Sequence, residues 1–201
     1  MSENRQYFSK TNDELPSNEK IIYGKINDLS FKFKTDNGVF SKDFLDFASK
    51  LLLEKMDYNS IIEGQILDVG CGYGPIGIYL AHKMKKDVVM LDINPRALAL
   101  SKENLKLNNV NARVLESDCL DSVINERFSC IITNPPIHAG KDVVYKIFTQ
   151  SYNVLIEGGS LWIVIQEKHG APSAIKKLKT IFENVDIFYK KKGFYILKCV
   201  K

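Results

Sequence analysis

The sequence lacks the segments that mark membrane and exported proteins. Its longest apolar runs, such as Ser160–Ile165, are strand-length and fall far short of the roughly 20 residues that cross a bilayer. Residues 1–18 are polar and lack the apolar core of a signal peptide. We therefore expect a cytoplasmic protein that has no membrane partner.

Cysteine is scarce, and its positions carry no metal signature. The four cysteines, at Cys71, Cys119, Cys130 and Cys199, show neither CxxC nor CxH spacing. Such spacing marks most zinc sites, and denser cysteines mark disulfide frameworks. We expect buried or strand-end thiols and no metal site. There are no internal repeats and no low-complexity tract, so 201 residues fit one globular domain with a short appendage.

Positive charge is concentrated in one part of the chain. From His138 to Lys201 there are eleven Lys, five acids and no Arg, which gives +6, while residues 1–137 carry −2. A basic third beside a slightly acidic remainder suggests a polyanionic partner. A solvated, lysine-rich surface explains this charge equally well.

Strand and helix patterns alternate from residue 65 onward. The expected strands are 65–69, 87–91, 112–115, 128–133, 160–166, 185–189 and 194–200, and the expected helices are 75–84, 95–107, 143–155 and 172–182. Gly158–Gly159 is expected to stop the third of these helices. The pattern predicts a Rossmann-like, doubly wound α/β fold with a mostly parallel seven-stranded sheet. Only a short turn separates the final two strands, so the last strand should be antiparallel.

A smaller structure is expected ahead of this sheet. Alternating apolar residues at 21–23 and 29–33, with Asn27–Asp28 between them, predict a β-hairpin. Ser41 is expected to cap a helix over 42–56. We therefore divide the chain into an N-terminal arm and hairpin, residues 1–40, and a main domain, residues 41–201.

The segment Ile66–Gly77 indicates a ligand site. An apolar strand runs into closely spaced glycines and then directly into a helix, and glycines let the backbone turn sharply and approach a ligand. Asp68 could accept hydrogen bonds from a cationic amine or from loop N–H groups. Asp92, at the end of the next strand, is placed to chelate two ribose hydroxyls, and Asp118 could accept from the exocyclic amine of adenine.

The same segment satisfies the dinucleotide fingerprint, so an NAD-dependent oxidoreductase is the alternative from another class. Gly72-x-Gly74-x-x-Gly77 is followed by Asp92 at about the expected 20-residue distance. Three features count against it. Asp68 precedes the glycines, where it would repel a pyrophosphate; the glycine-rich stretch is longer than a pyrophosphate turn requires; and no hydride-transfer constellation follows.

The strand that ends at Thr133 continues into Asn134-Pro135-Pro136. Two prolines make a rigid, extended corner at the sheet edge where ligands bind in α/β folds. A planar amine is a weak nucleophile because its lone pair is delocalised. If its two N–H bonds point at the Asn134 carboxamide oxygen and the Pro135 carbonyl, its lone pair is freed to attack a methyl sulfonium.

Together, Asp68–Gly74, Asp92, Asp118 and Asn134–Pro136 resemble the class I S-adenosylmethionine (SAM)-dependent methyltransferases that carry an Asn-Pro-Pro motif. A narrower resemblance links the chain to the small-domain methyltransferases related to RsmC, the 16S ribosomal RNA guanine-N2 methyltransferase; the segments that carry it are Tyr7–Ser9, Gly38–Ser41, Leu45–Ser49 and Asn134–Gly140. Two departures are the missing duplicated N-terminal half and Ile137, where many relatives place Tyr or Phe.

The resemblance implies SAM as cofactor, the exocyclic amine (N2) of guanine in small-subunit ribosomal RNA as methyl acceptor, and ribosomal RNA or the small ribosomal subunit as partner. Adenine N6 in nucleic acid and a protein glutamine amide stay open, as does the oligomeric state. The expected catalytic residues are Asn134, Pro135 and Pro136. The expected cofactor-binding residues are Phe40, Ser41, Asp68, Gly70, Cys71, Gly72, Gly74, Asp92, Ile93, Asp118, Cys119 and Asn134. The expected substrate-binding residues are Ile137, His138 and Lys141.

Overall fold

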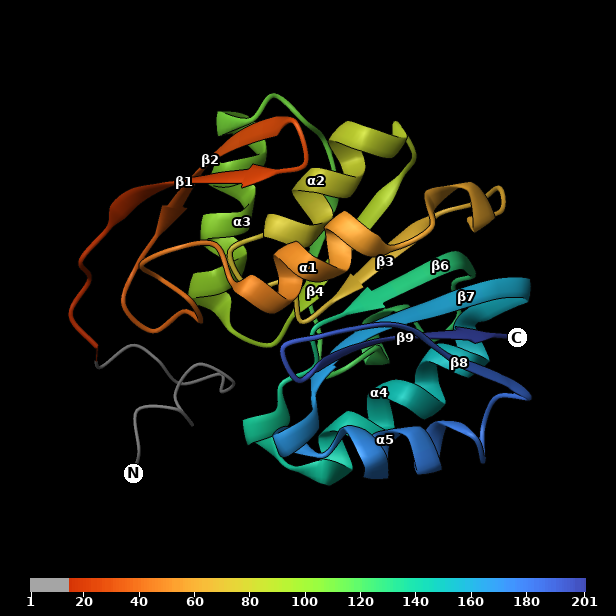
Figure 1. Cartoon of the computed structure of the whole chain (residues 1–201). Helices are drawn as coiled ribbons and strands as arrows, with labels where there is room; N and C mark the ends of the chain where they lie inside the picture. Colours follow the sequence, from red (N-terminus) through yellow and green to blue (C-terminus); the bar gives the residue numbers. More distant parts are fainter. Residues whose placement is uncertain (1–14) are drawn as a thin grey trace.

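A computed structural model describes residues 15–201 (Figure 1). Tyr7–Ser9, one of the segments that carry the family resemblance, lies outside these residues. The strands are β1 (Lys20–Ile26), β2 (Leu29–Thr35), β3 (Ile66–Val69), β4 (Val88–Asp92), β5 (Arg113–Glu116), β6 (Phe128–Thr133), β7 (Leu155–Gln166), β8 (Asn184–Lys191) and β9 (Phe194–Val200). The α-helices are α1 (Phe47–Lys55), α2 (Pro75–Met84), α3 (Pro95–Leu107), α4 (Lys141–Val154) and α5 (Ala171–Leu178).

The expected seven-stranded sheet is present, in the order β5-β4-β3-β6-β7-β9-β8. Strands β3 to β7 run parallel, and β9 is antiparallel to both of its neighbours. The turn between β8 and β9 is Lys192–Gly193, both with positive φ, as a two-residue hairpin turn requires. The fold prediction is therefore confirmed, including the antiparallel last strand.

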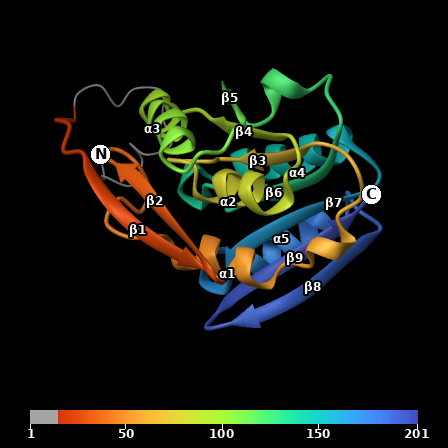
Figure 2. The same cartoon turned by 90° about the horizontal axis from the view of Figure 1, so that it is seen from above.

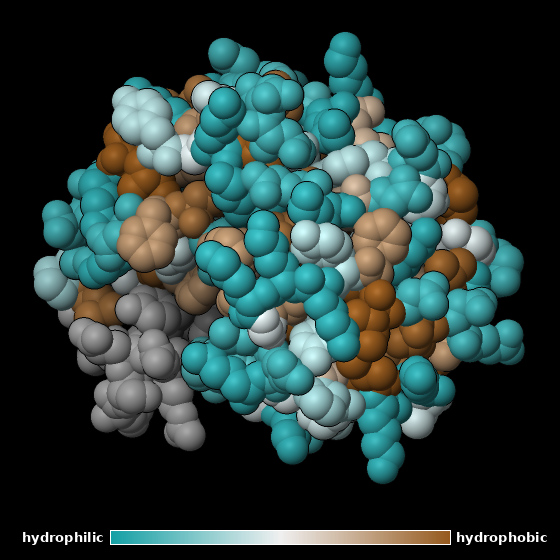
Figure 3. All heavy atoms as spheres, in the orientation of Figure 1, coloured by the Kyte–Doolittle hydropathy of each residue, from teal (hydrophilic) through white to brown (hydrophobic). Residues whose placement is uncertain are grey.

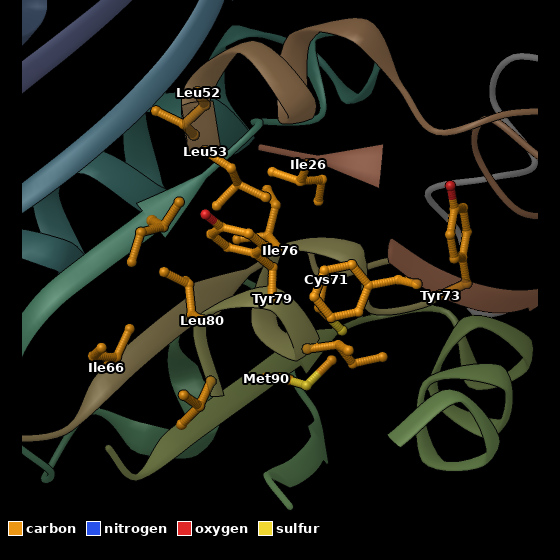
Figure 4. Close-up of a cluster of buried hydrophobic side chains, with 14 of the residues drawn as sticks. Ile26, Leu52, Leu53, Ile66, Cys71, Tyr73, Ile76, Tyr79, Leu80 and Met90 are labelled. Carbon is orange, nitrogen blue, oxygen red and sulfur yellow. The ribbon is translucent and has the colours of Figure 1, made fainter. Parts of the chain in front are cut away.

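Helices cover both faces of this sheet, with α1, α2 and α3 on one side and α4 and α5 on the other (Figure 1). The apolar faces of the strands feed two separate cores, one for each layer. On the first side, Ile26 of the hairpin, Leu53 of α1, Tyr79 of α2 and Met90 of β4 belong to one cluster, as Figure 4 shows. The hairpin, the first helices and the sheet therefore share a single core.

The predicted hairpin of β1 and β2 is also present, and its outer edge is covered by α3. Asn104 accepts from the backbone N–H of Lys34 and donates to the Lys34 carbonyl, at 2.6 and 2.9 Å. One helical turn later, Asn108 makes the same two contacts with Lys32, at 3.1 and 2.8 Å. Two asparagine side chains four residues apart thus pair with the otherwise open edge of β2.

Three boundary predictions were wrong. Helix α1 begins after Asp46, whose carboxylate accepts from the Ser49 N–H; Ser41 has φ +55° and cannot cap a helix. Gly158–Gly159 does not stop a helix but lies inside β7, which starts directly after α4. Helix α5 ends at Leu178, four residues early.

Hydrophilic side chains cover most of the face in Figure 3, and hydrophobic ones are exposed there in small patches. Among residues 15–201, no helix combines the length and the apolar character needed to cross a bilayer. All four cysteines are free thiols, and three of them are buried.

Candidate active site at the carboxyl edge of the sheet

A cavity of about 240 Å³ opens where β3, β4 and β6 end. Ten of the residues predicted to bind a cofactor line it: Phe40, Ser41, Gly70, Cys71, Gly72, Asp92, Ile93, Asp118, Cys119 and Asn134. The strands are parallel, so their carboxyl ends meet at one edge and bring together loops that are distant in sequence. Pro136 lines the cavity too.

The glycine loop keeps one wall of this cavity open. Gly70 and Gly72 have φ values of +75° and +56°, and a Cβ on either one would meet no protein atom within 4 Å. Gly74 differs, because it precedes α2 with φ +102° and a Cβ there would lie 2.9 Å from Met90 Cε. Gly70 and Gly72 therefore leave room for a ligand. Gly74 does not line the cavity, and its missing side chain instead avoids a clash with Met90 in the core.

Asp68 is fully buried beneath the loop and does not line the cavity. Its Oδ2 accepts from the Gly77 N–H at 2.8 Å, in the first turn of α2, where helix N–H groups lack intrahelical partners. Its Oδ1 has no hydrogen-bond partner among the described residues. Burial raises the pKa of Asp68 to about 8; the Gly77 hydrogen bond opposes the shift and Asp92 adds to it.

This buried carboxyl predicts a pH-dependent stability. The Asp68 pKa rises from 3.8 to about 8 on folding, so the folded state favours the protonated form, and its stability relative to the unfolded chain falls as pH rises from 4 to 8. We expect Asp68→Asn to gain stability over the wild-type protein between pH 5 and pH 8. Urea unfolding of both ligand-free proteins at the two pH values tests this, and a difference independent of pH would contradict it.

Asp92 closes the next strand and holds the loop in place. Its Oδ2 accepts from the Gly72 N–H at 2.8 Å, and its Oδ1 accepts from the Asn94 N–H at 2.9 Å. Burial raises the pKa of Asp92. Each carboxylate oxygen retains acceptor capacity toward the cavity. Asp118 stands at the outer rim of the cavity, is exposed, and lies 3.5 Å from the Lys146 ammonium.

The segment before α1 forms the opposite wall. The Asn94 side chain donates to the Gly38 carbonyl at 2.9 Å, and Arg96 donates to the Asn37 carbonyl at 2.9 Å. These contacts from the start of α3 fix residues 37–41 across the cavity, so that Phe40 and Ser41 line it.

Asn134 is held in one orientation by the start of α1. Its Nδ2 donates to Asp46 Oδ2 at 2.9 Å and to Ser49 Oγ at 3.1 Å. The same Asp46 oxygen accepts from the Ser49 N–H at 2.7 Å. With its amide nitrogen engaged by α1, the carboxamide leaves its Oδ1 as the group available to a ligand. The Pro135 carbonyl accepts from the Ile137 N–H at 2.8 Å and retains a second lone pair.

A second cavity, of about 180 Å³, adjoins the first at these residues. Phe40, Asp46 and Asn134 line both cavities. The second is also lined by Pro135, Ile137, His138, Gln166, His169 and Phe194. Asn134 therefore stands at the junction of two adjoining spaces, which is the arrangement that a transfer between two bound molecules needs.

Three predicted site residues, Asp68, Gly74 and Lys141, line neither cavity, and several residues that do line a cavity were not predicted. Lys141 is exposed at the start of α4 and lines neither cavity. The missed residues are Asp46, Ser49, Tyr73, Asn94, Gln166 and Phe194. Tyr73 is buried, lines the first cavity, and has a hydroxyl without a hydrogen-bond partner in the described chain. Of these, Asp46, Ser49 and Tyr73 lay in segments that the resemblance had singled out.

This fold and edge-of-sheet site are those of a methyltransferase. The chain belongs to the methyltransferase small domain family, whose model matches residues 30–198. It is 46% identical over 199 residues to the uncharacterized protein YbxB of Bacillus subtilis and covers 98% of each chain.

The chain is also similar to proteins named for their substrate. It is 39% identical over 132 residues to ribosomal RNA small subunit methyltransferase C of Pasteurella multocida, a match that covers 63% of this chain and 39% of that protein. Among solved structures, the T. thermophilus 16S rRNA N2 G1207 methyltransferase (RsmC), in complex with AdoMet and guanosine, superposes with a TM-score of 0.83. That match has 28% identity and covers 93% of this chain and 52% of RsmC. The chain thus spans about half or less of these substrate-named relatives.

Proposed function

We propose that this protein transfers the methyl group of SAM to the exocyclic N2 amine of guanine in small-subunit ribosomal RNA. The observation that carries the proposal is the position of Asn134, anchored through its amide nitrogen at the junction of two cavities. The similarity to RsmC, which was solved with AdoMet and guanosine, supports the choice of cofactor and acceptor.

The residues of the first cavity fit SAM. Gly70 and Gly72 leave open the space that side chains would fill, and Asp92 offers two carboxylate oxygens for ribose hydroxyls. We assign Asp118 to the adenine amine and Phe40 and Ser41 to the methionine end. Asp68, which accepts from the Gly77 N–H in the first turn of α2, supports the loop from beneath.

The second cavity is assigned to the guanine base. Ile137 and Phe194 provide apolar contact, and Gln166 and His138 provide polar groups. A base in a duplex cannot reach Asn134, so the target nucleotide must be unpaired or flipped out. The shared wall of Phe40, Asp46 and Asn134 brings the amine close to the cofactor cavity.

Bound SAM supplies an electrophilic methyl group on a sulfonium. Asn134 Oδ1 and the Pro135 carbonyl accept hydrogen bonds from the two N–H groups of the amine. These hydrogen bonds turn the lone pair of the amine toward the first cavity. The amine becomes more nucleophilic because its lone pair is no longer delocalised into the ring. The extra proton leaves the nitrogen after transfer, so no strong base is needed at the moment of attack.

The assignment is tested by incubating the protein and radiolabelled SAM with unmodified 16S ribosomal RNA and with 30S subunits, followed by nucleoside analysis. We expect label in N2-methylguanosine. Label in N6-methyladenosine or in protein would replace the proposed acceptor, and NADH binding in place of SAM binding in calorimetry would overturn the class of reaction.

Asp46 should position Asn134 without touching the reacting atoms. We expect Asp46→Ala to lower kcat by about 100-fold, since misplacing a reacting group costs rates of this order, and to lower stability by about 1 kcal/mol through loss of the helix cap. Asp46→Asn retains an acceptor oxygen, so its kcat should be at least tenfold higher than that of Asp46→Ala. Equal kcat in both variants would exclude positioning by Asp46.

A further inference from the structure

One face of the protein combines lysines and aromatic rings beside the second cavity. It consists of Phe47 and Lys55 of α1 and of Phe188, Tyr189, Lys191, Lys192, Phe194 and Lys198 of β8, β9 and their turn. We name it the α1–β9 face. Figure 2 shows α1 lying along these two strands at one border of the molecule.

This face is continuous with the second cavity. Phe194 lines that cavity, and its ring centroid lies 5.3 Å from that of the exposed Phe47. The turn beside it is anchored at the cavity rim, because the Gly193 carbonyl accepts from the Glu167 N–H at 2.7 Å. Gln166, the neighbour of Glu167, lines the cavity. A polymer whose base occupies the cavity and that leaves it past Phe194 therefore passes over this face.

The lysines of the face stand beside aromatic rings. Lys192 Nζ lies 5.8 Å from the ring centroid of Phe47, and Lys55 Nζ lies 5.4 Å from that of Tyr189. Lys198 Nζ lies 5.3 Å from the centroid of Trp162, whose ring is met edge-on by the exposed Phe188.

The positive charge on this face is largely free. Within residues 15–201, none of Lys55, Lys191, Lys192 and Lys198 makes an ion pair. Asp186 lies opposite Lys198 in the pairing of β8 with β9. Glu54 precedes Lys55 in α1, but its carboxylate pairs with Lys50 at 3.7 Å. The face therefore presents cations and π-surfaces together.

Resting on the function proposed above, we propose that the α1–β9 face binds the single-stranded RNA that flanks the target nucleotide. Lysines take the phosphates, and the exposed rings of Phe47 and Phe188 stack on bases, the combination that single-stranded nucleic acid requires. A nucleotide withdrawn from its stack to reach Asn134 leaves unpaired neighbours, and these lie where the face begins. A duplex would offer phosphates but no base planes to these rings.

The test compares two double charge reversals in the full-length protein. Lys55→Glu with Lys192→Glu alters the face. Lys176→Glu with Lys179→Glu makes the same charge change at exposed positions on α5 and directly after it, on the other side of the sheet. Binding of a labelled 12-nucleotide single-stranded RNA is followed by anisotropy across a salt series. For the face variant we expect affinity to fall at least tenfold and the salt slope to fall by about 1.4, or about 0.7 for each lost phosphate contact. The α5 variant should stay within threefold of the wild type.

Phe188→Ala separates stacking from charge. We expect it to weaken RNA binding about fivefold or more with an unchanged salt slope, while calorimetry shows unaltered SAM affinity in every variant. Equal losses in the face and α5 variants, or tighter binding of an RNA duplex, would overturn the proposal for this face. If the wild type and the face variant methylate ribosomal RNA equally well, the proposal that the α1–β9 face binds RNA is wrong, and the proposed function stands. If the wild type modifies only protein, the function itself fails.

Discussion

Asn134→Ala is expected to lower kcat by about a thousandfold, because it removes an acceptor that is fixed where the reacting amine must be oriented. The affinity for SAM should stay within about threefold, since the first cavity keeps its glycine loop and Asp92. Single-turnover transfer to 16S ribosomal RNA measures the first quantity, and calorimetry measures the second.

The control is Asn59→Ala, which makes the same chemical change at an exposed position of a short 3₁₀ turn and should leave kcat intact. If transfer survives in Asn134→Ala, the mechanism proposed for this site is wrong. If SAM affinity collapses with it, Asn134 contributes to the cofactor cavity more than to orientation of the acceptor.

Gly70→Ala is expected to weaken SAM binding by about 30-fold or more, because the new methyl group would project into space that the ligand must occupy. The substitution also places Ala at a positive φ, which costs about 1–2 kcal/mol of stability. Loss of binding could therefore reflect strain alone, and the experiment needs a glycine with the same geometry elsewhere.

Gly193 is that glycine. It has the same φ of +75°, and a Cβ there also meets no protein atom within 4 Å, but it lies in the turn between β8 and β9, outside the first cavity. Gly193→Ala should lose as much stability as Gly70→Ala and keep its SAM affinity in calorimetry. If both variants bind SAM like the wild type, the glycine loop does not form the cofactor wall.

Much of the site could be predicted because its residues follow directly from strand ends. Val69, Asp92 and Thr133 close three parallel strands, so the loops after them had to meet at one edge once the strand–helix alternation was recognised. Asn94 with Pro95 likewise predicted the start of α3, which the structure confirms.

The start of α1 could not be predicted in the same way. Ser41 and Asp46 are both good N-cap residues, and the choice between them depends on backbone angles that the loop 37–41 imposes through its contacts with α3. Because Asp46 was not seen as the cap, its second contact, with Asn134, was not foreseen either. Contacts between residues 88 positions apart leave no local pattern.

The prediction that Gly158–Gly159 stops a helix failed for a different reason. Glycines after a helix usually end it, but here the helix has already ended, and Gly159 lies where a Cβ would approach the Ile156 carbonyl oxygen to 2.8 Å. The register between β6 and β7 shifts in this region, and a strand irregularity favours glycine as strongly as a helix end does.

Because β9 lies between β7 and β8, residues 194–200 occupy an interior position of the sheet although they follow both neighbouring strands in the chain. While the chain is still being translated, β7 has an unpaired border and β8 has nothing to pair with. The basic hairpin that we assign to RNA binding therefore assembles only after residues 194–200 have been translated. A polypeptide interrupted before residue 194 would retain the glycine loop and Asn134 but would lack Phe194 of the second cavity and a completed sheet.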